Sequence, residues 1–141
     1  MNAVPYFIKQ TFMVRLPLGE DLLAAVAGAV KETGVRLGAF SVIGAASAAA
    51  FGYYDQKKRQ YQTIIRDGEF EIVTCSGNVT LKDNSPFVHA HVLFADEAGN
   101  SFGGHLMPGT VIFAAELCLQ ELDGEPLIRQ HDDVTGLFLW K

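Results

Sequence analysis

The segment Ser85-Pro86-Phe87-Val88-His89-Ala90-His91-Val92-Leu93-Phe94 decides how this chain folds, because it is apolar, strand-like and preceded by residues that favour a turn. Side chains alternate between the two faces of a strand, so His89 and His91 share a face. A polar stretch at 96–100 follows, and the segment 101–107 then returns as the second arm of a hairpin. The chain therefore contains an antiparallel strand pair with two histidines on one face.

The register of this hairpin brings a third histidine to the same face. If residues 96–100 form a five-residue loop, His91 lies directly across from His105, with Cβ atoms roughly 4.5–5.5 Å apart. His89 then occupies the near diagonal position, at about 7–8 Å. The prediction depends on this register, because a slip of one residue would turn His105 to the opposite face.

Three imidazoles on one face predict a site for a divalent transition metal, with zinc as the first candidate and iron, nickel or copper as alternatives. Three protein ligands leave a fourth position open, either for a water that the metal acidifies or for a small anionic ligand. Gly103 and Gly104 precede His105 and leave room for a ligand or another backbone. A cluster of hydrogen-bonded histidines in a cleft between subunits, or incidental placement, are the alternatives.

Two further titratable residues are candidates for the same site, and a third is not. Glu116 interrupts an apolar stretch at 111–119, where it could orient a histidine or act as a general base. The alternative is a carboxylate on an exposed strand face, paired with a basic residue or solvated. Glu71 has the same two interpretations. His131 is followed by two aspartates, and we expect it in a surface loop outside the histidine cluster.

The composition indicates a single domain over residues 1–141, large enough to bury a core without disulfides. Cys75 and Cys118 lie in apolar stretches, so we expect buried, reduced thiols. A net charge of −5 opposes unaided DNA binding, and the basic cluster at 57–59 is typical of a solvated hairpin tip. The uncharged stretch 37–54 is rich in alanine and glycine, which favours a buried sheet over a membrane span. The N-terminal residues lack a signal-peptide pattern, so we expect a cytoplasmic location.

The rest of the pattern predicts an α+β fold, with a mostly antiparallel mixed sheet and one main helix packed on it. The helix is expected at 21–32, with Gly34 as its stop. An extended segment is expected at 5–16. The remaining strands are expected at 39–43, 47–54, 60–65, 70–81, 87–95, 101–106, 111–121 and 136–140.

Several short motifs, taken in order, resemble the PPC domain, which is conserved in plants and prokaryotes. They cover most of the chain and lie at 38–45, 52–55, 70–73, 89–91, 103–106 and 110–119. The resemblance implies a compact sheet-and-helix fold that assembles as a homotrimer. It also implies a relation to single-domain prokaryotic proteins of uncertain function, some of which hold a metal at the three-histidine site.

The chain departs from the plant members of this family in two places. Plant members join the domain to AT-hook segments that bind DNA, and no Arg-Gly-Arg-Pro occurs here. They also carry a Gly-Arg-Phe-Glu-Ile stretch that contacts partner proteins, whereas this chain has Gly68-Glu69-Phe70-Glu71-Ile72. Because Glu69 replaces the arginine, we do not carry that partner over. We expect Phe70 and Ile72 to face a core or a subunit contact.

The sequence thus predicts a trimeric PPC-domain protein that binds a divalent metal through His89, His91 and His105, with a ligand-binding or regulatory role. A metal-dependent hydrolase or lyase, with Glu116 or Glu71 as base to a metal-activated water, is the alternative. A DNA-associated regulatory protein is a third possibility, drawn from the family label. The sequence does not decide whether the protein is an enzyme.

Overall fold

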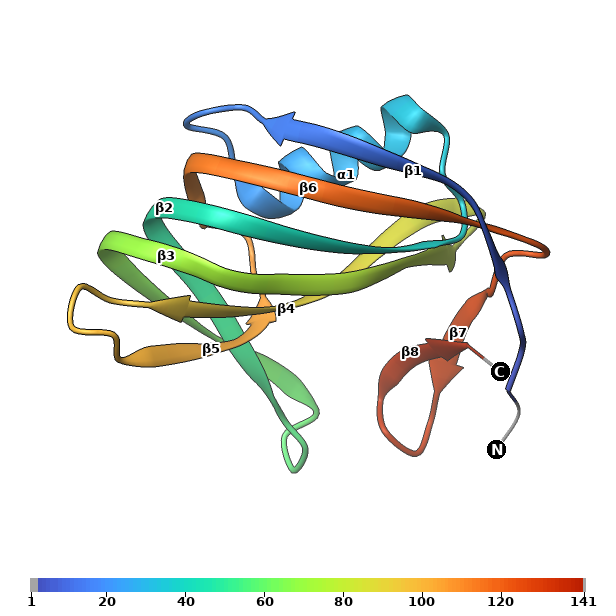
Figure 1. The fold of residues 1–141 in the computed structure, drawn as a ribbon. Helices are drawn as coiled ribbons and strands as arrows, with labels where there is room; N and C mark the ends of the chain where they lie inside the picture. Colours follow the sequence, from blue (N-terminus) through green and yellow to red (C-terminus); the bar gives the residue numbers. More distant parts are fainter. Residues whose placement is uncertain (1–2, 141) are drawn as a thin grey trace.

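The computed structural model describes residues 3–140, so Met1 and Asn2 of the N-terminal segment and Lys141 lie outside the described residues. One helix lies behind a curved sheet, and a small two-stranded sheet lies near both termini (Figure 1). In chain order the elements are β1 Phe7–Leu16, α1 Leu22–Thr33, β2 Gly38–Asp55, β3 Gln60–Lys82, β4 Ser85–Ala95, β5 Ser101–Leu106, β6 Val111–Asp123, β7 Arg129–Asp132 and β8 Leu137–Trp140.

The large sheet has the strand order β1-β6-β2-β3-β4-β5, and all of its ladders are antiparallel. The far end of β2 also pairs with β5, where Phe51 lies opposite Leu106 and Gly52 opposite His105. Strands β2 to β5 therefore close into a small barrel-like ring. The closure places the end of β5, which carries His105, beside Gly52 of β2.

Two strands are longer than the sequence predicts. The expected strands 39–43 and 47–54 are one strand, β2, and the expected strands 60–65 and 70–81 are one strand, β3. The break that the sequence predicts between residues 65 and 70 is wrong, because Gly68, with a φ of 141°, lies within β3. Glycine tolerates the positive φ of a bulge, so the strand bends there without ending.

The C-terminal hairpin is only partly predicted. β8 confirms the expected terminal strand, but the pattern gives no indication of β7. His131 therefore lies on a strand and not in the expected surface loop. It is exposed and outside the histidine cluster, as predicted.

The helix packs on the sheet through the residues that the helical spacing predicts. Asp21 caps its first turn, accepting a hydrogen bond from the Ala24 backbone N–H at 2.8 Å, and Gly34 ends it with a φ of 71°. Leu22, Val26 and Val30 are buried in the core between helix and sheet. Within residues 3–140, no helix is long and apolar enough to cross a membrane.

The interior of the ring is aromatic. Phe70 packs edge-on against Phe102 at 5.2 Å between ring centroids, and Phe94 and Phe51 complete the cluster. Ile72 is also buried, which confirms that the motif residues Phe70 and Ile72 face a core. These contacts anchor the inner face of β4, whose outer face carries the histidines.

Both cysteines are free thiols, as predicted. Cys75 is buried, and burial raises the pKa of its thiol to about 12, so it is protonated and unreactive at neutral pH. The expectation of burial is wrong for Cys118, which is only half-buried because it lies on the outer face of β6.

Candidate metal centre

The hairpin of β4 and β5 has the register that the sequence predicts, with His91 opposite His105. The connecting loop holds this register. One carboxylate oxygen of Asp96 accepts hydrogen bonds from the backbone N–H groups of Ala98 (3.0 Å) and Asn100 (2.8 Å). The Asn100 side chain donates to the second oxygen at 3.1 Å. Loop chemistry therefore decides which face the third histidine occupies.

The three imidazoles converge as expected. The ring centroids of His89 and His91 are 5.3 Å apart, those of His89 and His105 5.1 Å, and those of His91 and His105 5.4 Å. One ligand nitrogen from each ring lies within 4.8 Å of the other two. Among the described residues, no cysteine, aspartate or glutamate joins this group.

The electrostatics of the cluster suit a neutral, ligating imidazole. Burial, followed by the neighbouring His89 and His91, lowers the pKa of His105 to about 4. Burial also lowers the pKa of His89, with smaller contributions from Arg129 and His91. Both rings are therefore uncharged at neutral pH, which is the protonation state that binds a metal.

One ring nitrogen lacks the partner that a buried polar atom requires. The Nδ1 atom of His105 is buried and has no hydrogen-bond partner among the described residues. Native proteins rarely leave such an atom unsatisfied. A metal ion bound through this atom would satisfy it, and the three converging rings supply the donor set that such an ion needs.

The glycines beside His105 serve the backbone and not a ligand. A Cβ on Gly103 would overlap the carbonyl oxygen of Val92, and a Cβ on Gly104 would overlap the carbonyl oxygen of Gly52. Gly77, on the other side of β4, makes a similar close approach to the carbonyl of His89. Strand β4 is thus held between two glycine contacts, which keep both of its histidines in place.

Two residues that the sequence analysis missed complete the surroundings. Tyr61 stacks on His105 with ring centroids 4.5 Å apart, and Arg129 lies near His89. Together with both histidines they line a cavity of about 320 Å³, which we name the histidine pocket. No local motif marks either residue, because the pairing of β2 with both β3 and β5 brings Tyr61 to the site and the C-terminal hairpin brings Arg129.

The predicted carboxylates lie elsewhere. Glu116 is exposed on β6, opposite Arg15 on β1 and Ile43 on β2. Three strand spacings separate β6 from β4, which is roughly 14 Å. Within one chain, Glu116 is thus outside hydrogen-bond reach of a ligand on the histidines. Its catalytic role stays a prediction.

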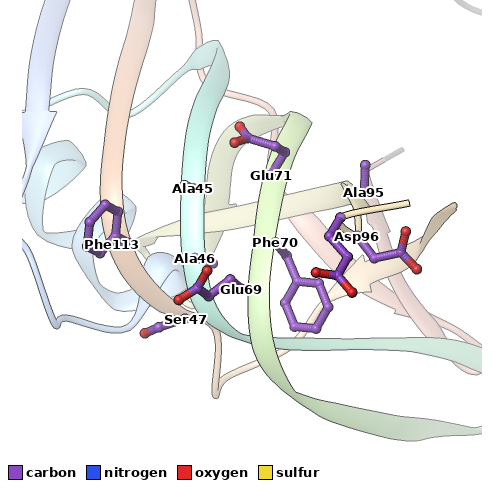
Figure 2. A pocket seen from close by; sticks show the side chains of 10 residues that line it. Ala45, Ala46, Ser47, Glu69, Phe70, Glu71, Ala95, Asp96 and Phe113 are labelled. Carbon is purple, nitrogen blue, oxygen red and sulfur yellow. The ribbon is translucent and has the colours of Figure 1, made fainter. Parts of the chain in front are cut away.

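Glu71 lines a different cavity, of about 370 Å³, near the middle of β3, whereas Tyr61 lies at the start of that strand. Figure 2 shows the side chains of Glu69 and Glu71 on β3. Ala45 lies on the neighbouring strand β2, and Phe113 lies on β6, on the other side of β2. Asp96 and Glu97 close the far side. This cavity contains no histidine and no basic side chain, so Glu71 does not belong to the candidate metal centre.

Comparisons with known proteins agree with the fold. The family model of the Plants and Prokaryotes Conserved (PCC) domain matches residues 6–123. A metal-containing protein of Archaeoglobus fulgidus is 38% identical, with a TM-score of 0.93 over 100% of this chain and 99% of the other. A plant- and prokaryote-conserved protein of Pyrococcus horikoshii is also 38% identical, with a TM-score of 0.93 over 100% and 97% of the two chains.

A curated relative shares sequence over a smaller part of its length. The bifunctional protein GlmU of Synechococcus sp. (strain JA-3-3Ab) is 29% identical over 129 residues. The match covers 90% of this chain but only 20% of that relative, so the chain spans about a fifth of the protein it matches.

Proposed function

This chain belongs to the Plants and Prokaryotes Conserved domain family, and on that basis we propose that it is a homotrimer that holds a divalent metal, preferably zinc, through His89, His91 and His105. The metal centre serves ligand binding or regulation. The observation that carries the proposal is the convergence of three ring nitrogens within 4.8 Å. The buried Nδ1 atom of His105, which has no hydrogen-bond partner among the described residues, supports it. The metal-containing relative from Archaeoglobus fulgidus supports it.

A bound zinc ion would supply a Lewis acid with one open coordination position. The chain itself contributes the uncharged imidazoles of His89 and His105, and His105 is stacked on Tyr61. No carboxylate among the described residues accompanies the histidines, so a general base of the kind that hydrolases use does not lie beside them. This arrangement favours a binding role over the hydrolase or lyase alternative.

Metal analysis of protein purified without an affinity tag tests the proposal. We expect one divalent ion per chain, removed by a strong chelator and restored by added zinc, because three imidazoles form a complete protein ligand set. The measurement is elemental analysis against protein concentration. Protein that contains no metal and takes up neither zinc, nickel nor cobalt would refute the proposal.

The outer face of the sheet supports the homotrimer. Met13, Ile43, Val73 and Phe113, on neighbouring strands, are 73%, 57%, 48% and 65% exposed. Large apolar side chains gathered on one face of a soluble protein mark an interaction surface. This face is separate from the core side of the sheet that α1 covers.

Substituting Phe113→Glu is expected to dissociate the trimer, because it places a charge in an apolar contact. Light scattering coupled to size exclusion should give the trimer mass for the wild type and a smaller species for the variant. Val134→Glu is the control, since Val134 is 82% exposed in the turn between β7 and β8. A wild type that is monomeric at micromolar concentration would contradict the assembly.

The DNA-associated role stays a prediction from the family label. A Bacteroides thetaiotaomicron structure described provisionally as DNA-binding is 20% identical, with a TM-score of 0.87, and shows the shared fold only. The net charge of −5 opposes phosphate binding. The basic residues 57–59 lie in the exposed turn between β2 and β3.

A further inference from the structure

The charge of the histidine pocket is opposite to that of the whole chain. Arg59, Lys82 and Arg129 line it, and no aspartate or glutamate does. The chain as a whole has 11 basic and 16 acidic residues, with a net charge of −5. A cavity that collects three cations and no carboxylate in an acidic protein favours a negatively charged occupant.

The most buried of these cations has no counter-ion among residues 3–140. Arg129 is 6% exposed, and it donates hydrogen bonds to the Thr80 hydroxyl (2.8 Å), the Asn78 side-chain oxygen (2.9 Å) and the Phe138 carbonyl (2.9 Å). All three acceptors are uncharged. A buried charge without an opposite charge is costly, and two of the five guanidinium N–H groups remain for another acceptor.

Lys82 is a second cation that lines the histidine pocket without a counter-ion among the described residues. Its ammonium group lies 3.6 Å from the ring centroid of Phe138 and 5.7 Å from that of Phe87. No carboxylate among the described residues forms an ion pair with it. Cation–π contacts hold the side chain against the wall and leave its charge available to a ligand.

The walls of the pocket are aromatic. Tyr54 and Tyr61, with ring centroids 5.1 Å apart, line it together with Phe87 and Phe138, which both lie near the Lys82 ammonium group. A volume of about 320 Å³ suits a small molecule. The occupant that fits therefore combines a flat apolar body with a negative group.

We propose that the histidine pocket binds a small aromatic anion, a carboxylate or a phosphate monoester, whose charged group lies against Lys82 and Arg129 beside His89. The inference deepens the proposed function, because it names the ligand class of the same site, and it rests on that function for the binding role of the pocket. The cations of the chain bind the anion whether or not a metal is present.

Calorimetric titration with benzoate, phenyl phosphate and the uncharged benzyl alcohol tests the inference, on zinc-loaded and on chelator-treated protein. At least one anion is expected to bind both forms, at least ten-fold more tightly than benzyl alcohol. Lys82→Met should weaken anion binding about ten-fold, since a hydrogen bond to a charged group is lost. Lys58→Met, the same change at the exposed turn between β2 and β3, should leave it unchanged. If Lys82→Met unfolds at a lower temperature than the wild type, Arg59→Met is tested in its place.

The outcomes separate this inference from the metal proposal. Anion binding by a protein that takes up no metal would uphold the pocket and refute the metal centre. Binding only to zinc-loaded protein, with Lys82→Met equal to Lys58→Met, would overturn the pocket inference and leave the metal centre intact. The inference would also be overturned if neither anion binds to either form of the protein, or if benzyl alcohol binds as tightly as both anions.

Discussion

Replacing His91 with alanine is expected to lower zinc affinity by at least about 100-fold, because even residues that only orient a metal ligand contribute 10–100-fold. His91 is the most exposed of the three histidines, so its removal disturbs folding least. The measurement is competition between protein and a chelating indicator at neutral pH. Thermal melting of the metal-free variant should match that of the metal-free wild type.

The fourth histidine provides a matched control. His131 lies outside the cluster, on β7, and its Nδ1 atom lies 3.0 Å from a carboxylate oxygen of Asp133. His131→Ala should therefore bind zinc as the wild type does. Equal zinc affinity in the His91→Ala and His131→Ala variants would show that the three converging rings are not the ligands.

Replacing Gly103 with alanine is expected to destabilise the fold by about 3 kcal/mol or more, which is the upper range for overpacked sites. The new Cβ would overlap the carbonyl oxygen of Val92 and lie 3.0 Å from the Leu93 Cα. These are backbone atoms of the paired strand, so no side-chain rotation relieves the clash. Urea unfolding of the metal-free protein measures the loss.

The same substitution elsewhere should have the opposite sign. Gly28 lies on the exposed side of α1, and a Cβ there meets nothing within 4 Å. Gly28→Ala should stabilise the fold by about 0.5–1 kcal/mol, the usual helix preference for alanine. If Gly103→Ala unfolds at the wild-type urea concentration, then β5 can move away from β4 without cost, and the site is less rigid than proposed.

The second consequence of Gly103→Ala concerns the histidines. His91 and His105 face each other only because β4 and β5 keep their register and close contact. Any folded fraction of the variant should therefore bind zinc more weakly than the wild type. If the two histidines move apart, they must be brought back together to bind the same ion, and this costs free energy.

Much of the candidate site was predictable because its determinants are local. Strand alternation places His89 and His91 on one face, and a five-residue loop places His105 opposite His91. The loop residues that hold this register, Asp96 and Asn100, are neighbours in the chain. The helix was equally local, with its cap at Asp21 and its end at Gly34.

The errors arose where backbone geometry is not encoded by a short pattern. A glycine within β3 suggests a turn from sequence alone, yet Gly68 lies in a bulge of a continuous strand. The bulges bend β2 and β3, and the bend allows β2 to pair with β5. That ring closure is a long-range event, so local propensity did not indicate it.

By itself the sequence determined that a hairpin presents three histidines on one face, since side-chain period and loop length are properties of adjacent residues. Only the tertiary structure decided what surrounds them. Tyr61, at the start of β3, lies against His105 because β2 pairs with both β3 and β5. Arg129 comes from the C-terminal hairpin, and Lys82 from the end of β3. The charge of a pocket depends on which distant strands pack around it, and packing is settled by burial across the whole chain.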